Sequence, residues 1–187
     1  MKRILLMGCG GTGSWLALFI AFGRRNSVFH ADVTLADPDI VEPKNLLYSN
    51  FLPEDVGKNK AEVLAKRYYF RAVKKEIKRV EELESFDLVI TATDNGYSRV
   101  MVHKSGKPWI DLRCKGRAYA AFAGKGETDE ARISREDIKV KGDSCQYTAD
   151  LISKNVQYGN IIAASIGWQM VMNWMRKEKI NRVVGFV

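Results

Sequence analysis

Residues 2–13 of this chain read KRILLMGCGGTG, and this stretch decides the fold. An apolar run of strand length enters a glycine-rich turn directly, and residues 14–23 then read as an apolar helix. A strand-to-helix turn pressed against a phosphate chain leaves no room for Cβ atoms, and the helix N-terminus offers N–H donors and a positive dipole end to the anion. The turn therefore predicts a nucleotide site formed by Gly8, Gly10, Gly11 and Gly13.

An acidic residue after the next strand completes the fingerprint. Residues 32–35, DVTL, read as that strand, and Asp37 follows 24 residues after Gly13, where a ligand of the ribose hydroxyls is expected. The alternative is that the glycines only allow close packing of strand and helix. Strand, turn, helix and acid together favour the nucleotide site.

Strands and helices alternate along much of the chain. We expect strands near residues 3–7, 32–36, 75–80, 86–92, 108–112 and 118–123, helices near 13–22, 60–71 and 96–105, and a closing helix over 158–174. This alternation is typical of an α/β fold, here a Rossmann-like, doubly wound, mainly parallel sheet with helices on both faces. Residues 1–187 form one predicted domain, in which the polar stretch 124–143 reads as a crossover or flexible flap.

The candidate ligands all follow strands of this predicted sheet. The apolar strand near 86–92 leads into Asp94 and Asn95, just as the first two strands lead into the glycine turn and Asp37. Ligands of open α/β sheets bind where the carboxyl ends of the parallel strands meet. We therefore expect these groups to converge on one edge.

Four separated motifs carry a resemblance to a known family. They are GCGGTG at 8–13, DPDIVEPKNL at 37–46, GKNK at 57–60 and TDNGYSR at 93–99, and residues 108–116, PWIDLRCKG, look like the strand that follows. In order and spacing they resemble the ThiF/MoeB/HesA family, adenylating enzymes related to ubiquitin-activating enzymes. An NAD(P)-dependent oxidoreductase shares the glycine loop, but the other three motifs have no role in hydride transfer.

The resemblance implies a function and a set of roles. The implied activity is ATP-dependent adenylation of the C-terminal carboxylate of a small ubiquitin-like or sulfur-carrier protein, with ATP and Mg²⁺ as cofactors. Asp37 would bind the ribose, Asn45 and Lys60 would hold the phosphates and orient the α-phosphoryl group, and Asp94 would hold Mg²⁺. The full set of nucleotide ligands is then Gly8, Gly10, Gly11, Gly13, Asp37, Asp39, Asn45, Lys60, Asp94 and Asn95.

Two departures from the family pattern leave an alternative open. Tyr48 stands where the family has an arginine that grips the phosphates, and tyrosine cannot fork two phosphate oxygens as arginine does. Relatives also have an arginine on a helix before the first strand, whereas this sequence starts at Met1 on the strand. Either Lys44, Lys58 or a partner supplies the missing charge, or the chain is a catalytically weakened ATP-binding adaptor.

The three cysteines carry separate expectations. They form no C-x-x-C pair, so we expect no structural zinc. Cys9 reads as a small residue of the glycine turn and Cys114 as a packed core thiol. Cys145 lies among polar residues before the closing helix, where thioester-forming relatives place a nucleophilic cysteine, although a structural role is the alternative. Free thiols without a signal peptide suggest a cytoplasmic protein.

Charge and hydrophobicity restrict the partners. Thirty Lys and Arg residues against 22 Asp and Glu residues give a net charge of +8. This charge fits either nucleic-acid binding or a basic face exposed to solvent. Nucleic-acid binding is the weaker interpretation, because no basic patch with interleaved aromatic residues occurs in the sequence. A membrane-spanning helix needs about 20 mostly apolar residues in a row, and the sequence contains no such run, so we expect no membrane span. The closing helix carries apolar residues at helical spacing: Ile161, Ile162, Ile166, Met170 and Trp174. This apolar face either packs on the sheet or forms the interface of a homodimer.

Overall fold

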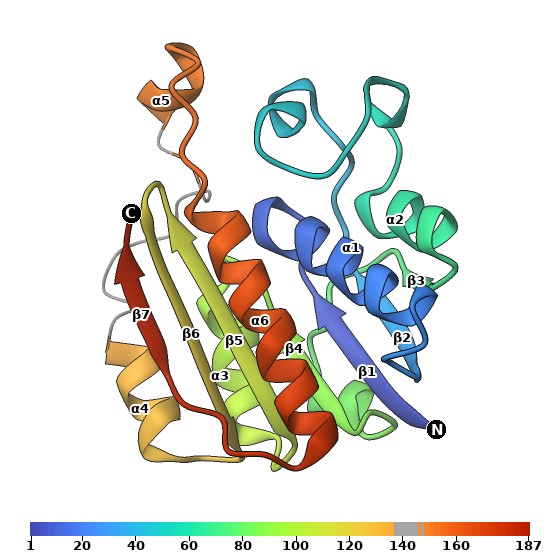
Figure 1. Ribbon diagram of the computed structural model, residues 1–187, viewed down its shortest axis with the longest axis vertical. Helices are drawn as coiled ribbons and strands as arrows, with labels where there is room; N and C mark the ends of the chain where they lie inside the picture. Colours follow the sequence, from blue (N-terminus) through green and yellow to red (C-terminus); the bar gives the residue numbers. More distant parts are fainter. Residues whose placement is uncertain (137–145, 147) are drawn as a thin grey trace.

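The computed structural model describes residues 1–136, 146 and 148–187. Seven strands in this part of the chain form one sheet in the order β3-β2-β1-β4-β5-β6-β7 (Figure 1). The strands are β1 (Lys2–Met7), β2 (Ala31–Ala36), β3 (Arg71–Val73), β4 (Leu88–Thr91), β5 (Pro108–Lys115), β6 (Ala118–Lys125) and β7 (Val183–Phe186). Strands β1 to β5 are parallel, and β6 and β7 add antiparallel to one edge.

Helices cover both faces of the sheet. The α-helices are α1 (Gly11–Arg25), α2 (Lys60–Tyr68), α3 (Gly96–Lys104), α4 (Asp129–Glu136), α5 (Thr148–Ile152) and α6 (Gly159–Arg176), and the 3₁₀ turns are η1 (Pro43–Leu47), η2 (Pro53–Asp55) and η3 (Val80–Leu83). Alternate residues of β1 enter different cores, Ile4 and Leu6 against α1, α2 and α6, and Leu5 and Met7 against α3 and α4. The expected doubly wound α/β fold is confirmed.

Two glycines of the turn after β1 are required by packing. Gly8 has φ +90°, and a Cβ there would lie 2.7 Å from the carbonyl oxygen of Ala92. A Cβ on Gly13 would lie 1.8 Å from the carbonyl oxygen of Gly8. Gly10 differs, because a Cβ there would meet no atom within 4 Å. Close packing therefore explains Gly8 and Gly13 but gives no reason for Gly10.

The structure corrects one expected strand and adds a strand, β7, and two α-helices, α4 and α5, that the sequence did not predict. Residues 75–80 are not a strand. The third strand is the shorter β3, and the basic residues after it bind Glu82, with Lys75 Nζ 2.6 Å from Glu82 Oε1 and the Lys78 and Arg79 N–H groups 3.1 Å from Oε2. Ile77 alternates with these charges but is buried in an irregular segment, which imitates a half-exposed strand. The strand β7 was not predicted.

The polar stretch 124–143 contains α4, one of the two unexpected helices. Its first residues end β6, and residues 129–136 form α4, which packs against β6 and buries Ala131. The remainder, 137–143, lies outside the described residues. Within the described residues, no helix has the length and hydrophobicity needed to cross a bilayer.

The apolar face of the closing helix packs inside the protein. Helix α6 lies against β5, β6 and α1, Met170 is buried, and Ile166 and Trp174 pack on the same core (Figure 1). Gly167 allows this approach, because a Cβ there would lie 2.5 Å from Leu112 Cδ1. These three residues are therefore used by the fold, whereas Ile161 and Ile162 of the same face are half-buried, and the homodimer stays a prediction.

A buried carboxylate joins β4, β5 and α3 beside the carboxyl ends of the strands. Asp111 on β5 has no solvent exposure, and its Oδ1 accepts from Thr91 Oγ1 at 3.1 Å. The Arg99 Nε atom lies 3.3 Å from Oδ1, and Arg113 donates to Oδ2 from Nη2 at 2.6 Å and from Nε at 3.2 Å. His103 Nε2 lies 3.5 Å from Oδ2. Burial raises the pKa of Asp111, but the His103 ring and the two guanidinium groups outweigh it and hold the pKa below its usual range.

Alanine substitutions at two glycines should distinguish a position where packing requires glycine from a position where a Cβ meets no other atom. We expect Gly13→Ala to lower the free energy of unfolding by more than about 2 kcal/mol, because the new Cβ overlaps the Gly8 carbonyl and the backbone must move. The matched control, Gly10→Ala, places its Cβ in open space and should change the free energy far less. Urea titrations measure both, and equal losses in the two variants would contradict this account of the turn.

Asp111→Asn should destabilise the protein and change its response to acid. Removing one partner of a buried ion pair costs about 3–5 kcal/mol, because the guanidinium charges stay buried. A carboxyl whose pKa is lower in the folded state stabilises the fold above its unfolded pKa of about 3.9, and this contribution is lost as the pH falls. Unfolding titrations between pH 6 and pH 3 should therefore show a shallower decline in the variant than in the wild type.

Candidate functional site

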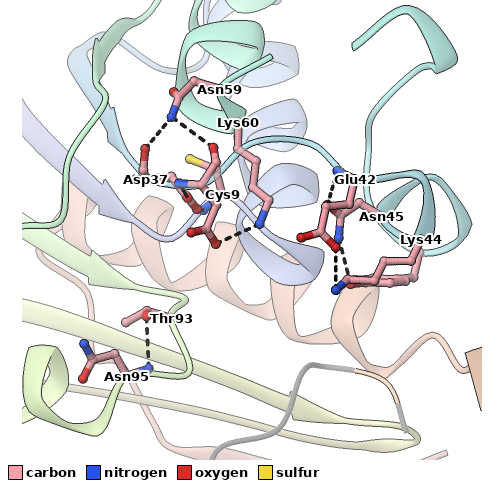
Figure 2. A network of polar contacts seen from close by, with 11 residues as sticks. Cys9, Asp37, Glu42, Lys44, Asn45, Asn59, Lys60, Thr93 and Asn95 are labelled. Carbon is pink, nitrogen blue, oxygen red and sulfur yellow. Dashed lines mark hydrogen bonds and ion pairs between the residues drawn. The ribbon is translucent and has the colours of Figure 1, made fainter. Parts of the chain in front are cut away.

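The candidate ligands meet at the carboxyl ends of β1, β2 and β4. The glycine turn joins β2 through the Gly8 N–H, which donates to the Ala36 carbonyl at 2.9 Å, and it joins β4 through the Ala92 N–H, which donates to the Met7 carbonyl at 2.8 Å. Asp37 and residues 93–95 continue the same two strands. Figure 2 shows Cys9, Asp37 and Lys60 as one group, with Thr93 and Asn95 on the neighbouring segment.

Asp37 ties the glycine turn to the end of β2. The carboxylate is 5% exposed, its Oδ2 accepts from the Cys9 N–H at 2.6 Å, and its Oδ1 accepts from the Asp39 N–H at 2.8 Å. Burial raises the pKa of Asp37, although these two N–H groups and Lys60 act against the rise. Ionised Asp37 therefore costs folding stability as the pH rises above its unfolded pKa. Donor hydroxyls of a ligand would recover part of that cost.

Lys60 begins α2 beside this carboxylate, as expected. Its side chain is 12% exposed, and Nζ forms an ion pair with Asp39 Oδ2 at 3.0 Å. Asn59 caps the helix by accepting from the Glu62 N–H, and its Nδ2 donates to the carbonyls of Asp37 at 2.9 Å and Asp39 at 3.0 Å. Sequence reasoning overlooked Asn59, although an Asn directly before a helical run is a capping signal.

Asn45 and Tyr48 form a buried pair on η1. Asn45 is 4% exposed, accepts from the Glu42 N–H through Oδ1 and donates from Nδ2 to the Tyr48 hydroxyl, both at 2.9 Å. Lys44 forms an ion pair with Glu42. Tyr48 thus occupies the position of the family arginine as a hydrogen-bonding partner of Asn45, and it brings no charge.

The backbone of Tyr48 connects η1 to the glycine turn. Its carbonyl accepts from Trp15 Nε1 at 2.9 Å and from Asn160 Nδ2 at 2.7 Å. The same Asn160 amide donates to the Gly11 carbonyl at 3.1 Å. Asn160 is fully buried at the start of α6, and no sequence motif pointed to it because its partners lie more than a hundred residues away.

Asp94 and Asn95 have different surroundings. Asp94 is exposed, and no hydrogen bond or ion pair from the described residues occupies its carboxylate. Asn95 caps α3 by accepting from the Tyr97 N–H at 2.9 Å, and its Nδ2 donates to Glu76 Oε1 at 2.6 Å. The Asn95 side chain is therefore committed to the fold, whereas Asp94 is available to a ligand.

The residues at this edge fit a metal that arrives with its nucleotide. No cluster of three or more His, Cys, Asp or Glu side chains that could cage a metal occurs in the part of the chain that the structure describes. Mg²⁺ commonly binds through one or two carboxylates together with substrate phosphates, and keeps several waters. The single available carboxylate of Asp94 matches that pattern.

The cysteines lie in three different settings. Cys9 is fully buried in the glycine turn, and burial, together with the Asp37 charge, raises its thiol pKa well above the usual value. Cys114 is half-buried at the end of β5, with Sγ 3.3 Å from Thr12 Oγ1 on α1. The proposed nucleophile Cys145 lies outside the described residues.

Comparison with known proteins identifies the family. The ThiF family model matches residues 1–184, and no curated protein sequence matches the chain. Among solved structures, E. coli MccB with ATP has a TM-score of 0.71 at 18% identity over 100% of this chain and 60% of that one.

Two further structures are equally similar. Microcin C7 biosynthetic enzyme MccB in complex with N-formylated MccA has a TM-score of 0.71 at 17% identity, covering 100% of this chain and 62% of that one. Selenomethionine PaaA has a TM-score of 0.68 at 18% identity, covering 100% and 61%. The chain thus spans about three fifths of these neighbours, and at such identities the likeness concerns the fold. The family match over nearly the whole sequence shows that this chain belongs to the ThiF family.

Proposed function

We propose that this chain is an ATP-dependent adenylyltransferase that activates the C-terminal carboxylate of a small ubiquitin-like or sulfur-carrier protein. The observation that carries the proposal is that the motifs meet at one sheet edge. The glycine turn, Asp37 and the loop of Asp94 follow the neighbouring strands β1, β2 and β4, and Lys60 pairs with Asp39 beside them. The family and the ATP-bound E. coli MccB structure support a nucleotide at this edge. None of the motifs outside the glycine turn serves hydride transfer.

The proposed reaction needs charge stabilisation more than a general base. A carboxylate oxygen of the acceptor attacks the α-phosphorus, a new P–O bond forms, and the bond to the bridging oxygen breaks with its electron pair leaving on pyrophosphate. Negative charge develops on the transferring group and the leaving group, so fixed cations and N–H donors provide the catalysis. The amino end of α1 offers such donors, since Gly10 at its N-cap has no side chain to occupy them.

The lysines at this edge are paired with carboxylates before the nucleotide binds. Lys60 contacts Asp39 and Lys44 contacts Glu42, while Asp37 and Asp94 add further negative charge. A triphosphate approaching this edge alone would meet more carboxylates than ammonium groups. Bound Mg²⁺ would neutralise phosphate oxygens, and Asp94 would hold it. Lys60 is then released from Asp39 to the phosphates, and Asp37 accepts from the ribose hydroxyls.

The buried Tyr48 favours a second candidate, an ATP-binding adaptor that does not adenylate. Replacing an arginine by a neutral side chain removes a charged contact worth about 3 kcal/mol in the transition state. A homodimer in which the neighbour supplies further cations would compensate, with its interface away from the packed face of α6. Transfer to Cys145 belongs to the adenylyltransferase proposal: the thiolate would attack the acyl carbon of the adenylate, a C–S bond would form, and AMP would leave.

Nucleotide binding should depend on Lys60 and not on its neighbours. In calorimetric titrations with Mg²⁺ present, we expect Lys60→Gln to weaken ATP binding about tenfold or more, because a hydrogen bond to a charged group contributes about 1.5–3 kcal/mol. Lys66→Gln is the matched control, an exposed lysine of the same helix. ATP at a hundred times its dissociation constant should also stabilise the protein by about 2.7 kcal/mol. Stabilisation by NAD alone would refute the nucleotide assignment.

Pyrophosphate exchange separates the enzyme from the adaptor. With candidate carrier proteins present, the wild type should exchange labelled pyrophosphate into ATP, and Asp94→Asn should lower the rate at least a hundredfold without a change in the thermal midpoint. Asp129→Asn, an exposed aspartate at the start of α4, is the control and should retain the rate. Tight ATP binding without exchange for any acceptor would favour the adaptor.

A further inference from the structure

One guanidinium group connects the buried carboxylate to the loop that carries Asp94. Arg99, on α3, is 12% exposed, and its Nε lies 3.3 Å from Asp111 Oδ1. Its Nη2 donates to the carbonyl oxygen of Thr93. The arginine therefore lies at ion-pair distance from a fully buried anion through Nε and donates through Nη2 to the residue directly before Asp94.

The loop is held on both sides of Asp94. On one side, the Thr93 carbonyl accepts a hydrogen bond from Arg99, and Thr93 Oγ1 accepts one from the Asn95 N–H at 3.1 Å. On the other side Asn95 caps α3, the helix that carries Arg99 (Figure 2). The Asp94 carboxylate between these anchors is exposed. The fold thus fixes the backbone of this loop and leaves its charged side chain available.

The contact that holds Arg99 is a buried ion pair with Asp111. Apolar side chains in place of this pair would stabilise the fold equally well. Burying a carboxylate with arginines gains little net stability, since desolvation offsets the attraction. The Arg99 guanidinium at ion-pair distance from the fixed Asp111 carboxylate does supply direction, because its nitrogens share one rigid plane. Stability alone therefore leaves this arrangement unexplained.

We propose that Arg99 and Asp111 are positioning residues that set the loop of Asp94 for binding of the metal–triphosphate complex. This inference rests on the proposed nucleotide function. Asp111 orients Arg99, Arg99 fixes the Thr93 carbonyl, and the Asp94 carboxylate then needs little reordering when the nucleotide arrives with its cation. A displacement of about 1 Å in such a group can lower a rate a hundredfold.

Arg113 provides a matched control within the same cluster. It donates to Oδ2 of Asp111 through two nitrogens and lies with its guanidinium carbon 5.4 Å from the centre of the Phe122 ring. Among the described residues it donates no hydrogen bond to Thr93. Arg99→Gln and Arg113→Gln therefore remove the same charge from the same carboxylate, and they differ in the contact with the loop.

The test compares ATP affinity with Mg²⁺ and with EDTA, by calorimetry on the full chain. For the wild type we expect Mg²⁺ to tighten binding. In Arg99→Gln, the ratio of the ATP affinity with Mg²⁺ to the ATP affinity with EDTA should fall at least tenfold, while the affinity in EDTA changes less than twofold. Arg113→Gln should keep the ratio of the wild type. Equal losses in the two variants, or a loss that is the same with and without Mg²⁺, would overturn the positioning role.

Two additions keep the result interpretable. If Arg99→Gln does not fold, as judged by near-ultraviolet circular dichroism, Arg99→Lys is used instead, because a single ammonium cannot reach both acceptors and should lose the same gain. A wild type that binds no ATP in either condition contradicts the proposed function itself, whereas a wild type with a clear Mg²⁺ gain that Arg99→Gln and Arg99→Lys retain contradicts the positioning role alone.

Discussion

The contact between Gly13 and the Gly8 carbonyl is the constraint on which the rest of the site depends. It brings the first turn of α1 against the end of β1 more closely than any side chain would permit. With the turn folded in this way, the Cys9 N–H donates to Asp37 directly after β2, and the Met7 carbonyl accepts from the Ala92 N–H directly after β4. Three strands thereby present their ends together, and Gly10 is left facing open space.

The electrostatics of this edge point to a site that awaits a charged ligand with its counterion. Lys60 and Lys44 are each paired with a carboxylate, and burial raises the pKa of Asp37. Such pairs are broken when a stronger anion replaces the carboxylate. A cation bound to the phosphates would reduce the repulsion from the acidic side chains, which is why the single available carboxylate of Asp94 is central to the proposal.

Tyr48 shows how one substitution alters the balance between structure and charge. Its hydroxyl accepts from Asn45 of η1, and its carbonyl accepts from Trp15 and Asn160. An arginine at this position would bring a charge to the phosphates and would lose the bond between hydroxyl and amide. The order of η1 is therefore maintained by neutral hydrogen bonds, and cations for the reaction have to come from Lys60, from Lys44 or Lys58, from bound metal or from a second subunit.

The sequence by itself determined the features whose cause is local. The glycine turn, the acid after β2 and the start of α2 at Lys60 follow from periodicity, turn chemistry and helix signals within a few residues, and the order of strands and helices implied the parallel sheet. Tertiary structure alone decided the rest. Residues 75–80 alternate like a strand but pair with Glu82, and β7 and α4 are placed by packing on β6. Asn160 joins Gly11 and Tyr48, and Asp111 joins Arg99 and Arg113, because a sheet brings distant residues together and a buried polar group must find its partner wherever the fold supplies one.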